Sequence, residues 1–252
     1  MTDAVYLDHN ATTPLRAEAR DAMARAMAVT GNASSVHGFG RDQRKIVEDA
    51  RELVAALAGC APANVLFTSG GSEANNAALR GIAAAVRFAS AVEHASVLEA
   101  DAGIKPLAVD SDGVVMFDAL YAALSDTDEP ALVSVMAANN ETGVLQPIDR
   151  IAEIVHGHQG RLHVDAVQAA GKLPLADIVV QADAVTLSAH KLGGPQGVGA
   201  LILKDGVAIE PLIRGGGQER RRRAGTENVV GIAGFGAACR AAAGDVDRAA
   251  AL

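Results

Sequence analysis

The chain has 252 residues, of which half are hydrophobic and only 3% are aromatic. This length suffices for one large α/β domain with an aliphatic core, or for two small domains. A formal net charge of −8 argues against nucleic acid or an anionic membrane as the main partner.

The sequence also lacks the marks of export. No apolar stretch reaches the ~20 residues that cross a bilayer, and the first residues have no signal-peptide pattern. The two cysteines, Cys60 and Cys239, form neither a disulfide framework nor a metal-ligand spacing. We therefore expect a cytoplasmic protein that binds no membrane and no metal.

Helical and strand patterns alternate along the chain. A helix is predicted after Thr13-Pro14, and a second one carries apolar residues at helical spacing from 46 to 57 and stops at Gly59. Aliphatic runs of strand length follow at 65–68, 132–136, 162–164, 184–187 and 199–203. An alanine-rich helix is predicted from residue 231 to the last residue.

Such runs, separated by helices, predict a mainly parallel sheet that is covered on both faces. In sheets of this kind ligands bind beyond the carboxyl ends of the strands. The polar motifs of this sequence directly follow the predicted strands, which indicates a site at that edge.

Two of these motifs carry specific chemistry. Ser188-Ala189-His190-Lys191 places one primary amine at a strand end, before a glycine loop, where it can condense with an aldehyde. Asp165 ends another predicted strand. A lysine for a Schiff base and a carboxylate for a pyridinium nitrogen are the two protein groups that pyridoxal phosphate requires.

The remaining motifs are ambiguous when each is taken alone. Gly70-Gly71-Ser72 opens a predicted helix and suits a phosphate, but it is equally an ordinary glycine turn. Asn139-Asn140 can hydrogen-bond a ligand or form a turn, and His94 can be purely structural. His163 and Asp165 share a strand face, and a metal there lacks supporting ligands. The arginine run 220–223 is most simply a solvated face.

Taken together, the motifs resemble one family. They are Tyr-Leu-Asp-His-Asn-Ala-Thr-Thr-Pro at 6–14, Gly-Asn-Ala-Ser-Ser-Val-His at 31–37, Asn-Asn-Glu-Thr-Gly at 139–143, Val-Asp-Ala-Val-Gln at 164–168, Ser-Ala-His-Lys at 188–191 and Arg-Ala-Gly-Thr-Glu-Asn at 223–228. The sequence is similar, over essentially its whole length, to the class V pyridoxal-phosphate enzymes and specifically to the NifS/IscS-like cysteine desulfurases.

The resemblance implies a fold and a set of roles. The fold is the fold type I large domain, with a mainly parallel sheet of the seven-stranded type. Lys191 would bind the cofactor covalently, and Asp165 would pair with the ring nitrogen. The other implied roles are phenolic-oxygen binding by Gln168, ring stacking and proton transfer by His94, contact with ring and substrate by Asn140, phosphate binding by Gly71, Ser72, Ser188 and His190, and contact of Thr226 with the cofactor of the other subunit of a homodimer.

The implied reaction converts L-cysteine to L-alanine and leaves a persulfide for a sulfur-acceptor protein that serves iron–sulfur cluster assembly or tRNA thiolation. The expected domains are an N-terminal segment (1–13), the cofactor-binding large domain (14–238) and the start of a largely missing small domain (239–252). The family's nucleophilic cysteine and substrate-carboxylate arginine are expected beyond residue 252, and neither Cys60 nor Cys239 matches that position. We therefore expect the chain alone to have the cofactor site without the sulfur-transfer group.

Other interpretations remain open at this point. The same motifs fit a selenocysteine lyase or another class V lyase or aminotransferase. An inactive scaffold that keeps the fold is a further alternative, although it does not need Lys191, Asp165 and His94 together. An RNA-binding module that uses residues 220–223 is the weakest, because no aromatic platform accompanies the arginines.

Overall fold

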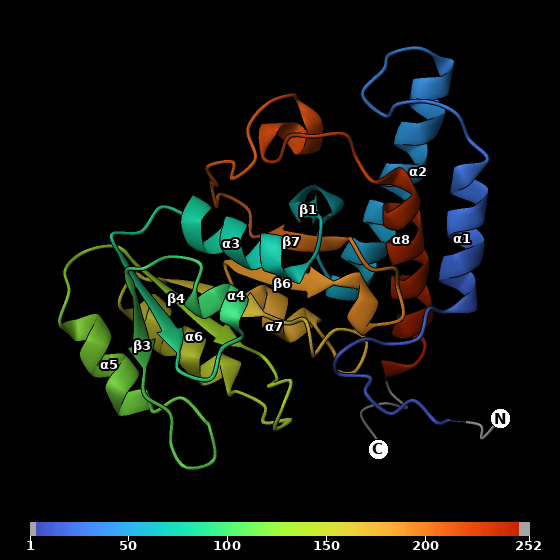
Figure 1. Cartoon of the computed structure of the whole chain (residues 1–252). Coiled ribbons are helices and arrows are strands. Elements are labelled where there is room, and N and C mark those ends of the chain that lie inside the picture. Colours follow the sequence, from blue (N-terminus) through green and yellow to red (C-terminus); the bar gives the residue numbers. More distant parts are fainter. Residues whose placement is uncertain (1–3, 247–252) are drawn as a thin grey trace.

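A computed structural model describes residues 4–246 and contains one seven-stranded sheet (Figure 1). The strand order is β1-β7-β6-β5-β4-β2-β3. Strand β7 is antiparallel to both β1 and β6, and the other neighbouring pairs are parallel. The strands are β1 (Val65–Thr68), β2 (Val86–Ser90), β3 (Ile104–Leu107), β4 (Ala131–Met136), β5 (Arg161–Asp165), β6 (Ala184–Ser188) and β7 (Gly199–Leu203).

Helices cover the sheet and extend beyond it. The α-helices are α1 (Ala17–Met27), α2 (Gly38–Ala58), α3 (Gly71–Gly81), α4 (Ala95–Leu98), α5 (Phe117–Ser125), α6 (Ile148–Gly157), α7 (Ala176–Gln181) and α8 (Val229–Ala243). Three short 3₁₀ turns are η1 (Pro62–Asn64), η2 (Ala189–Lys191) and η3 (Gln218–Arg221).

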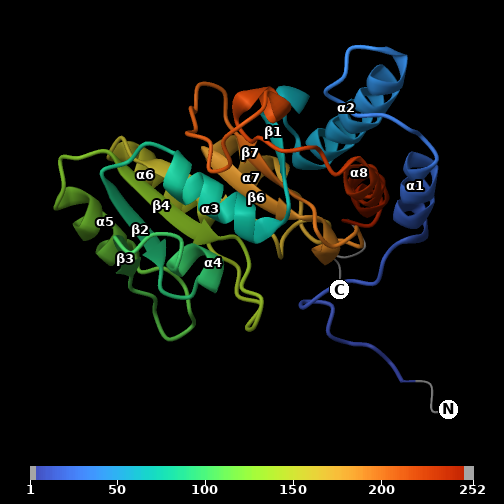
Figure 2. The ribbon, with the colours of Figure 1, turned by 45° about the horizontal axis from the view of Figure 1, so that its top comes forward.

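Alternate residues of one strand show that both faces of the sheet are buried. In β1, Val65 and Phe67 belong to a large core that also contains residues of α2, α6 and α8, whereas Leu66 belongs to a second core with residues of α3 and α4. Successive side chains of a strand point to opposite faces. The sheet is therefore the middle of three layers, with α3 and α4 on one face (Figure 2).

Helices α1, α2 and α8 pack side by side at one flank of the sheet (Figures 1 and 2). Alanine and glycine on α8 allow the close approach. A Cβ added to Gly236 would lie 2.7 Å from the Cα of Ala50 on α2. Apolar side chains hold this helical flank together.

A buried ion pair joins α2 to η3. Arg51 Nη2 lies 2.7 Å from Glu219 Oε1, and both side chains are at most 5% exposed. Glu219 also accepts the backbone N–H of Phe67 (2.9 Å), and Arg51 donates to the carbonyl of Val65 (2.9 Å). The pair thereby fixes the loop before residues 223–228 to β1.

Most of the predicted elements are confirmed. All five predicted strands are present, β1 and β7 with the expected bounds, and α2 ends at Gly59 in the left-handed conformation (φ 71°). Sequence patterns missed β2, β3, α5 and α7. The fold is the expected α/β arrangement with a mostly parallel sheet and helices on both faces.

The domain division stays a prediction. The expected boundary between residues 238 and 239 falls inside α8, and residues 1–3 and 247–252, which belong to the first and last expected segments, lie outside the described residues. Within 4–246, no helix is long and apolar enough to cross a membrane.

Candidate active site

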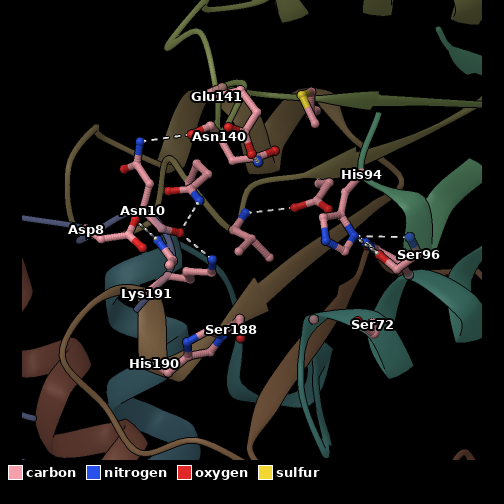
Figure 3. A pocket seen from close by; sticks show the side chains of 18 residues that line it. Asp8, Asn10, Ser72, His94, Ser96, Asn140, Glu141, Ser188, His190 and Lys191 are labelled. Atoms are coloured by element: carbon pink, nitrogen blue, oxygen red, sulfur yellow. Dashed lines mark hydrogen bonds between the residues drawn. The ribbon is translucent and has the colours of Figure 1, made fainter. Parts of the chain in front are cut away.

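A cavity of about 440 Å³ lies where β5 and β6 end (Figure 3). Its walls come from the N-terminal segment, the start of α3, the turn before α4, the loop after β4 and the ends of β5 and β6. It brings together all the site residues predicted from the sequence except Thr226, namely Gly71, Ser72, His94, Asn140, Asp165, Gln168, Ser188, His190 and Lys191.

Lys191 ends η2, directly after β6. Its ammonium donates a hydrogen bond to the backbone carbonyl of Asn10. Thr13 fixes this turn, since its N–H donates to the carbonyl of His190 (2.8 Å) and its hydroxyl to that of Lys191 (2.8 Å). Burial lowers the pKa of Lys191, although the charges of Asp165, Asp8 and Glu141 oppose that shift. A lowered pKa increases the fraction of neutral amine, which is the nucleophilic form.

Asp165 ends β5 and is 6% exposed. Its Oδ1 accepts the N–H of Val167 (2.9 Å), and its Oδ2 accepts the side-chain amide of Asn75 (2.7 Å). Burial raises the pKa of Asp165, while these hydrogen bonds and the charges of His94 and Lys191 favour the carboxylate. A cationic partner in the cavity would stabilise the ionised form further.

His94 precedes α4 as its N-cap residue. Its Nδ1 accepts the backbone N–H of Ser96 (3.1 Å) and lies 2.8 Å from the hydroxyl of the same residue. Because a backbone N–H only donates, Nδ1 carries no proton in the neutral ring, and the proton is on Nε2. Figure 3 shows the ring across the cavity from Lys191.

One end of the cavity has the features of an anion site. The start of α3 contributes Gly71 and Ser72, and Ser188 and His190 lie beside it (Figure 3). The first N–H groups of a helix have no partner within the helix and favour an anion. A Cβ added to Gly71 would lie 3.0 Å from Val167 Cγ2, so glycine allows α3 to begin close against the loop after β5.

Asn140 and Gln168, the two amide residues predicted for the site, have different surroundings. Asn140 donates its side-chain N–H to Glu141 Oε1 (2.6 Å), while the neighbouring Asn139 forms the turn by accepting the N–H groups of Glu141 (2.8 Å) and Thr142 (3.0 Å). Gln168 donates from Nε2 to the carbonyl of Asn10 (2.9 Å). Asn139 therefore has the turn role, and Asn140 is the residue that lines the cavity.

Sequence patterns missed several residues of this site. Asn10 accepts from Lys191 and Gln168 through its carbonyl, and its side chain donates to the carbonyl of Asn140 (3.0 Å). Asn75 donates to Asp165 and also to Ser96 Oγ (2.9 Å). Asn10 stands inside the motif at 6–14 and Asn75 lies on α3, but their partners are distant along the chain, and no local signal predicts those contacts.

Thr226 is exposed and does not line the cavity, so its role toward another subunit stays a prediction. The arginine run before it is not simply a solvated face. Arg223 pairs with Glu73 on α3 (2.9 Å), and Arg220 and Arg222 both donate to the carbonyl of Ala63 (2.6 and 3.0 Å). The run therefore attaches this loop to the body of the domain.

Comparisons with known proteins agree with this geometry. The class-V aminotransferase family pattern matches residues 5–251. A cysteine desulfurase IscS from Dictyoglomus turgidum is 42% identical over 97% of this chain. The solved structure of a NifS-like protein from Rickettsia africae superposes with a TM-score of 0.91 at 36% identity, over 97% of this chain and 70% of that one. A structure of SspA in complex with cysteine has a TM-score of 0.86 at 30% identity, over 94% of this chain and 72% of that one.

The chain therefore belongs to the class-V aminotransferase family, in the branch that contains the NifS- and IscS-type cysteine desulfurases. This family is pyridoxal-phosphate-dependent. The chain spans 65% of the length of the curated relative from D. turgidum.

Proposed function

We propose that this chain carries the pyridoxal phosphate site of a cysteine desulfurase. The observation that carries the proposal is the meeting of Lys191 and Asp165, from the ends of two neighbouring strands, in one cavity that also contains the start of α3. An amine, an acid and an anion site are the three features that this cofactor needs from a protein.

The residues at the anion end support a phosphate. The helix start supplies backbone donors, and the Ser72 and Ser188 hydroxyls can add further ones. The nearby carboxylate of Glu73 is neutralised by Arg223, and Arg223 also donates to it at 3.2 Å through Nη2. Although burial acts to raise it, hydrogen bonds from Arg223 and Ser69 leave the pKa of Glu73 lowered, so it stays an ionised partner of Arg223.

When bound, pyridoxal phosphate withdraws electrons from the α-carbon of an amino acid. In the proposed site, Asp165 would hold a proton at the ring nitrogen, Gln168 would donate to the phenolic oxygen, and His94 would contact the ring. Lys191 would hold the cofactor, and its amine would serve as the base for the proton of the substrate α-carbon. The lowered pKa of Lys191, caused by burial, suits both tasks.

We propose L-cysteine as the substrate and L-alanine as the product, with sulfur passing to an acceptor protein for iron–sulfur cluster assembly or tRNA thiolation. The names of the relatives and the cysteine complex of SspA support this choice. We further propose a cytoplasmic homodimer in which Thr226 reaches the cofactor of the second subunit.

Neither cysteine of the chain has the properties of an attacking thiolate. Burial raises the pKa of Cys60 to about 11, and Cys239 on α8 is fully buried with a raised pKa. A nucleophilic cysteine instead needs a lowered pKa and access to the substrate. We therefore assign the sulfur-accepting thiol to neither residue.

Absorption spectroscopy with pyridoxal phosphate tests the cofactor site. We expect the chain to acquire visible absorbance, and borohydride reduction to fix the cofactor to Lys191 in the peptide mass map. The Lys191→Ala variant should lose both signals, whereas Lys204→Ala, which changes an exposed lysine outside the cavity, should keep them. Borohydride labelling at a different lysine would overturn the assignment, and comparison of cysteine, selenocysteine and alanine as amino-acid ligands would test the substrate.

A further inference from the structure

We propose that Lys172 is a positioning residue that directs the amide of Gln168 into the cavity as a donor and makes that side of the cavity selective for an anionic oxygen. The inference rests on the proposed function, because the oxygen in question is the phenolic oxygen of pyridoxal phosphate. It concerns a residue outside the sequence motifs, four positions after Gln168.

The contacts of Gln168 fix the orientation of its amide. Lys172 Nζ donates to Gln168 Oε1 (2.8 Å), and Gln168 Nε2 donates to the carbonyl of Asn10 (2.9 Å). An ammonium only donates and a carbonyl only accepts, so the reversed amide would face two mismatched partners. With Oε1 bound by Lys172, the amide group available to the cavity is the second N–H of Nε2.

The hydrogen bonds of Lys172 are made to neutral groups. Its two recorded partners are neutral oxygens, Gln168 Oε1 and Asn10 Oδ1 (3.4 Å), and no carboxylate of residues 4–246 forms an ion pair with it. Burial and the charge of Lys191 lower the pKa of Lys172. The Lys191 ammonium lines the cavity, and the Lys172 ammonium lies behind the Gln168 amide that lines it, so both cations favour a negative charge on a ligand atom bound by Gln168.

These facts predict which ligand atom is preferred. A ligand oxygen that accepts from Gln168 Nε2 lies in the field of Lys172, which is transmitted through the polarised amide. An ionised oxygen binds more tightly because of that field, whereas a hydrogen atom at the same position gains no binding free energy from it. Lys172 also holds the side chain of Asn10, whose carbonyl binds the amine of Lys191, so the same cation steadies both groups.

Equilibrium binding to two ligands tests the inference without measuring turnover. The ligands are pyridoxal 5′-phosphate and 3-deoxypyridoxal 5′-phosphate, which lacks the phenolic oxygen. We expect Lys172→Met to weaken binding of the first ligand about tenfold, the size expected for one charge-assisted hydrogen bond, and binding of the second less than twofold. Lys172→Arg, which keeps a cation that only donates, should restore the preference, and Lys204→Met should change neither affinity.

The outcomes separate the two proposals. Equal loss of affinity for both ligands in Lys172→Met would show a merely structural role and overturn the inference, while the proposed function stands. If the unsubstituted chain binds neither ligand, the proposed function itself fails. Should Lys172→Met not fold, Lys172→Gln removes the charge with a polar side chain, and an unchanged ligand preference there would also overturn the inference.

Discussion

Two regions of the molecule bury charge in opposite ways. Around Arg51 and Glu219 every charged atom has a partner, and the guanidinium also lies 4.7 Å from the centre of the Phe67 ring. Beside the cavity, by contrast, Lys172 forms no ion pair with a carboxylate of residues 4–246 and donates only to the neutral oxygens of Gln168 and Asn10. Charges that are fully paired within the protein stabilise the fold. A cation that has no anionic partner in the protein can instead stabilise an anionic ligand.

The ion pair of Arg51 and Glu219 also stabilises a segment of left-handed backbone. Glu219, Arg220 and Arg221 have φ values of 44°, 58° and 67°. This left-handed region costs roughly 1–2 kcal/mol for each residue other than glycine. The contacts of Glu219 with Arg51 and with the N–H of Phe67 compensate for this strain and fix the loop.

We therefore expect the largest effect on stability when the ion pair of Arg51 and Glu219 is broken. Glu219→Gln leaves the Arg51 guanidinium without its buried counter-charge, and we expect a loss of about 3–5 kcal/mol in the free energy of unfolding, measured by urea denaturation. Glu48→Gln is the matched control, because Glu48 also contacts Arg51 (3.1 Å) but has a side chain 48% exposed, and it should lose under ~1 kcal/mol. Equal losses in the two variants would contradict the contrast between the regions.

Glu93 should have a smaller effect, on how the free energy of unfolding depends on pH. Its buried carboxyl contacts the backbone of Met136, a residue that lines the cavity. Burial and the charge of Asp165 raise the pKa of Glu93 well above 4.5, although the N–H of Met136 (2.6 Å) opposes them. The folded state therefore keeps a proton that the unfolded chain releases. The resulting stabilisation is complete below about pH 4.5 and decreases as the pH rises toward the folded pKa.

Urea unfolding between pH 5 and 8 measures that proton. The free energy of unfolding of the parent chain should fall with rising pH more steeply than that of Glu93→Gln, by up to ~1.4 kcal/mol per pH unit. Glu48→Gln again serves as the control and should keep the parent slope. Identical slopes for Glu93→Gln and the parent would show that Glu93 is already ionised in the folded protein.

At the cysteines the expected effect is on chemical reactivity and not on the stability of the fold. With a pKa of about 11, Cys60 should react ~300-fold more slowly at neutral pH than an ordinary thiol of pKa 8.5. Cys239, which is fully buried, should react only after unfolding. Labelling with a thiol reagent, with and without urea, checks both statements. Rapid labelling of either cysteine in the folded chain would make it a candidate sulfur nucleophile again.

The sequence predicts the five strands from β1 to β4 in the order of the sheet, but it does not predict β2 and β3 at the other end. Strands β4 and β6 lie in the interior of the sheet and are mostly aliphatic, and β5 between them keeps Leu162 and Val164 as its apolar signal. Strand β3 is at an edge and contains Lys105 and Pro106, and β2 begins with Val86-Arg87. An edge strand such as β3 tolerates charge and proline. The charged residue in β2 and the charge and proline in β3 interrupt the apolar signal of both segments.

The site shows a similar division. Motif residues such as Lys191, Asp165 and Ser72 are predicted because their spacing places them at strand ends and at a helix start. The residues that support them are not predicted. Lys172 and Asn10 become part of the site only through contacts that bring distant segments together, and a single sequence contains no record of those contacts.

The path of residues 10–16 beside the lysine loop has a practical consequence. Besides the bonds from Thr13, the N–H and the guanidinium of Arg16 donate to the carbonyls of Gly193 (2.9 Å) and Leu192 (3.0 Å). Deletion of the residues up to and including 16 would remove these hydrogen bonds on either side of Lys191. A bulky fusion partner attached directly before this segment would strain them. The visible absorbance that a recombinant protein acquires with pyridoxal phosphate would then report whether its N-terminal segment still holds the lysine loop in place.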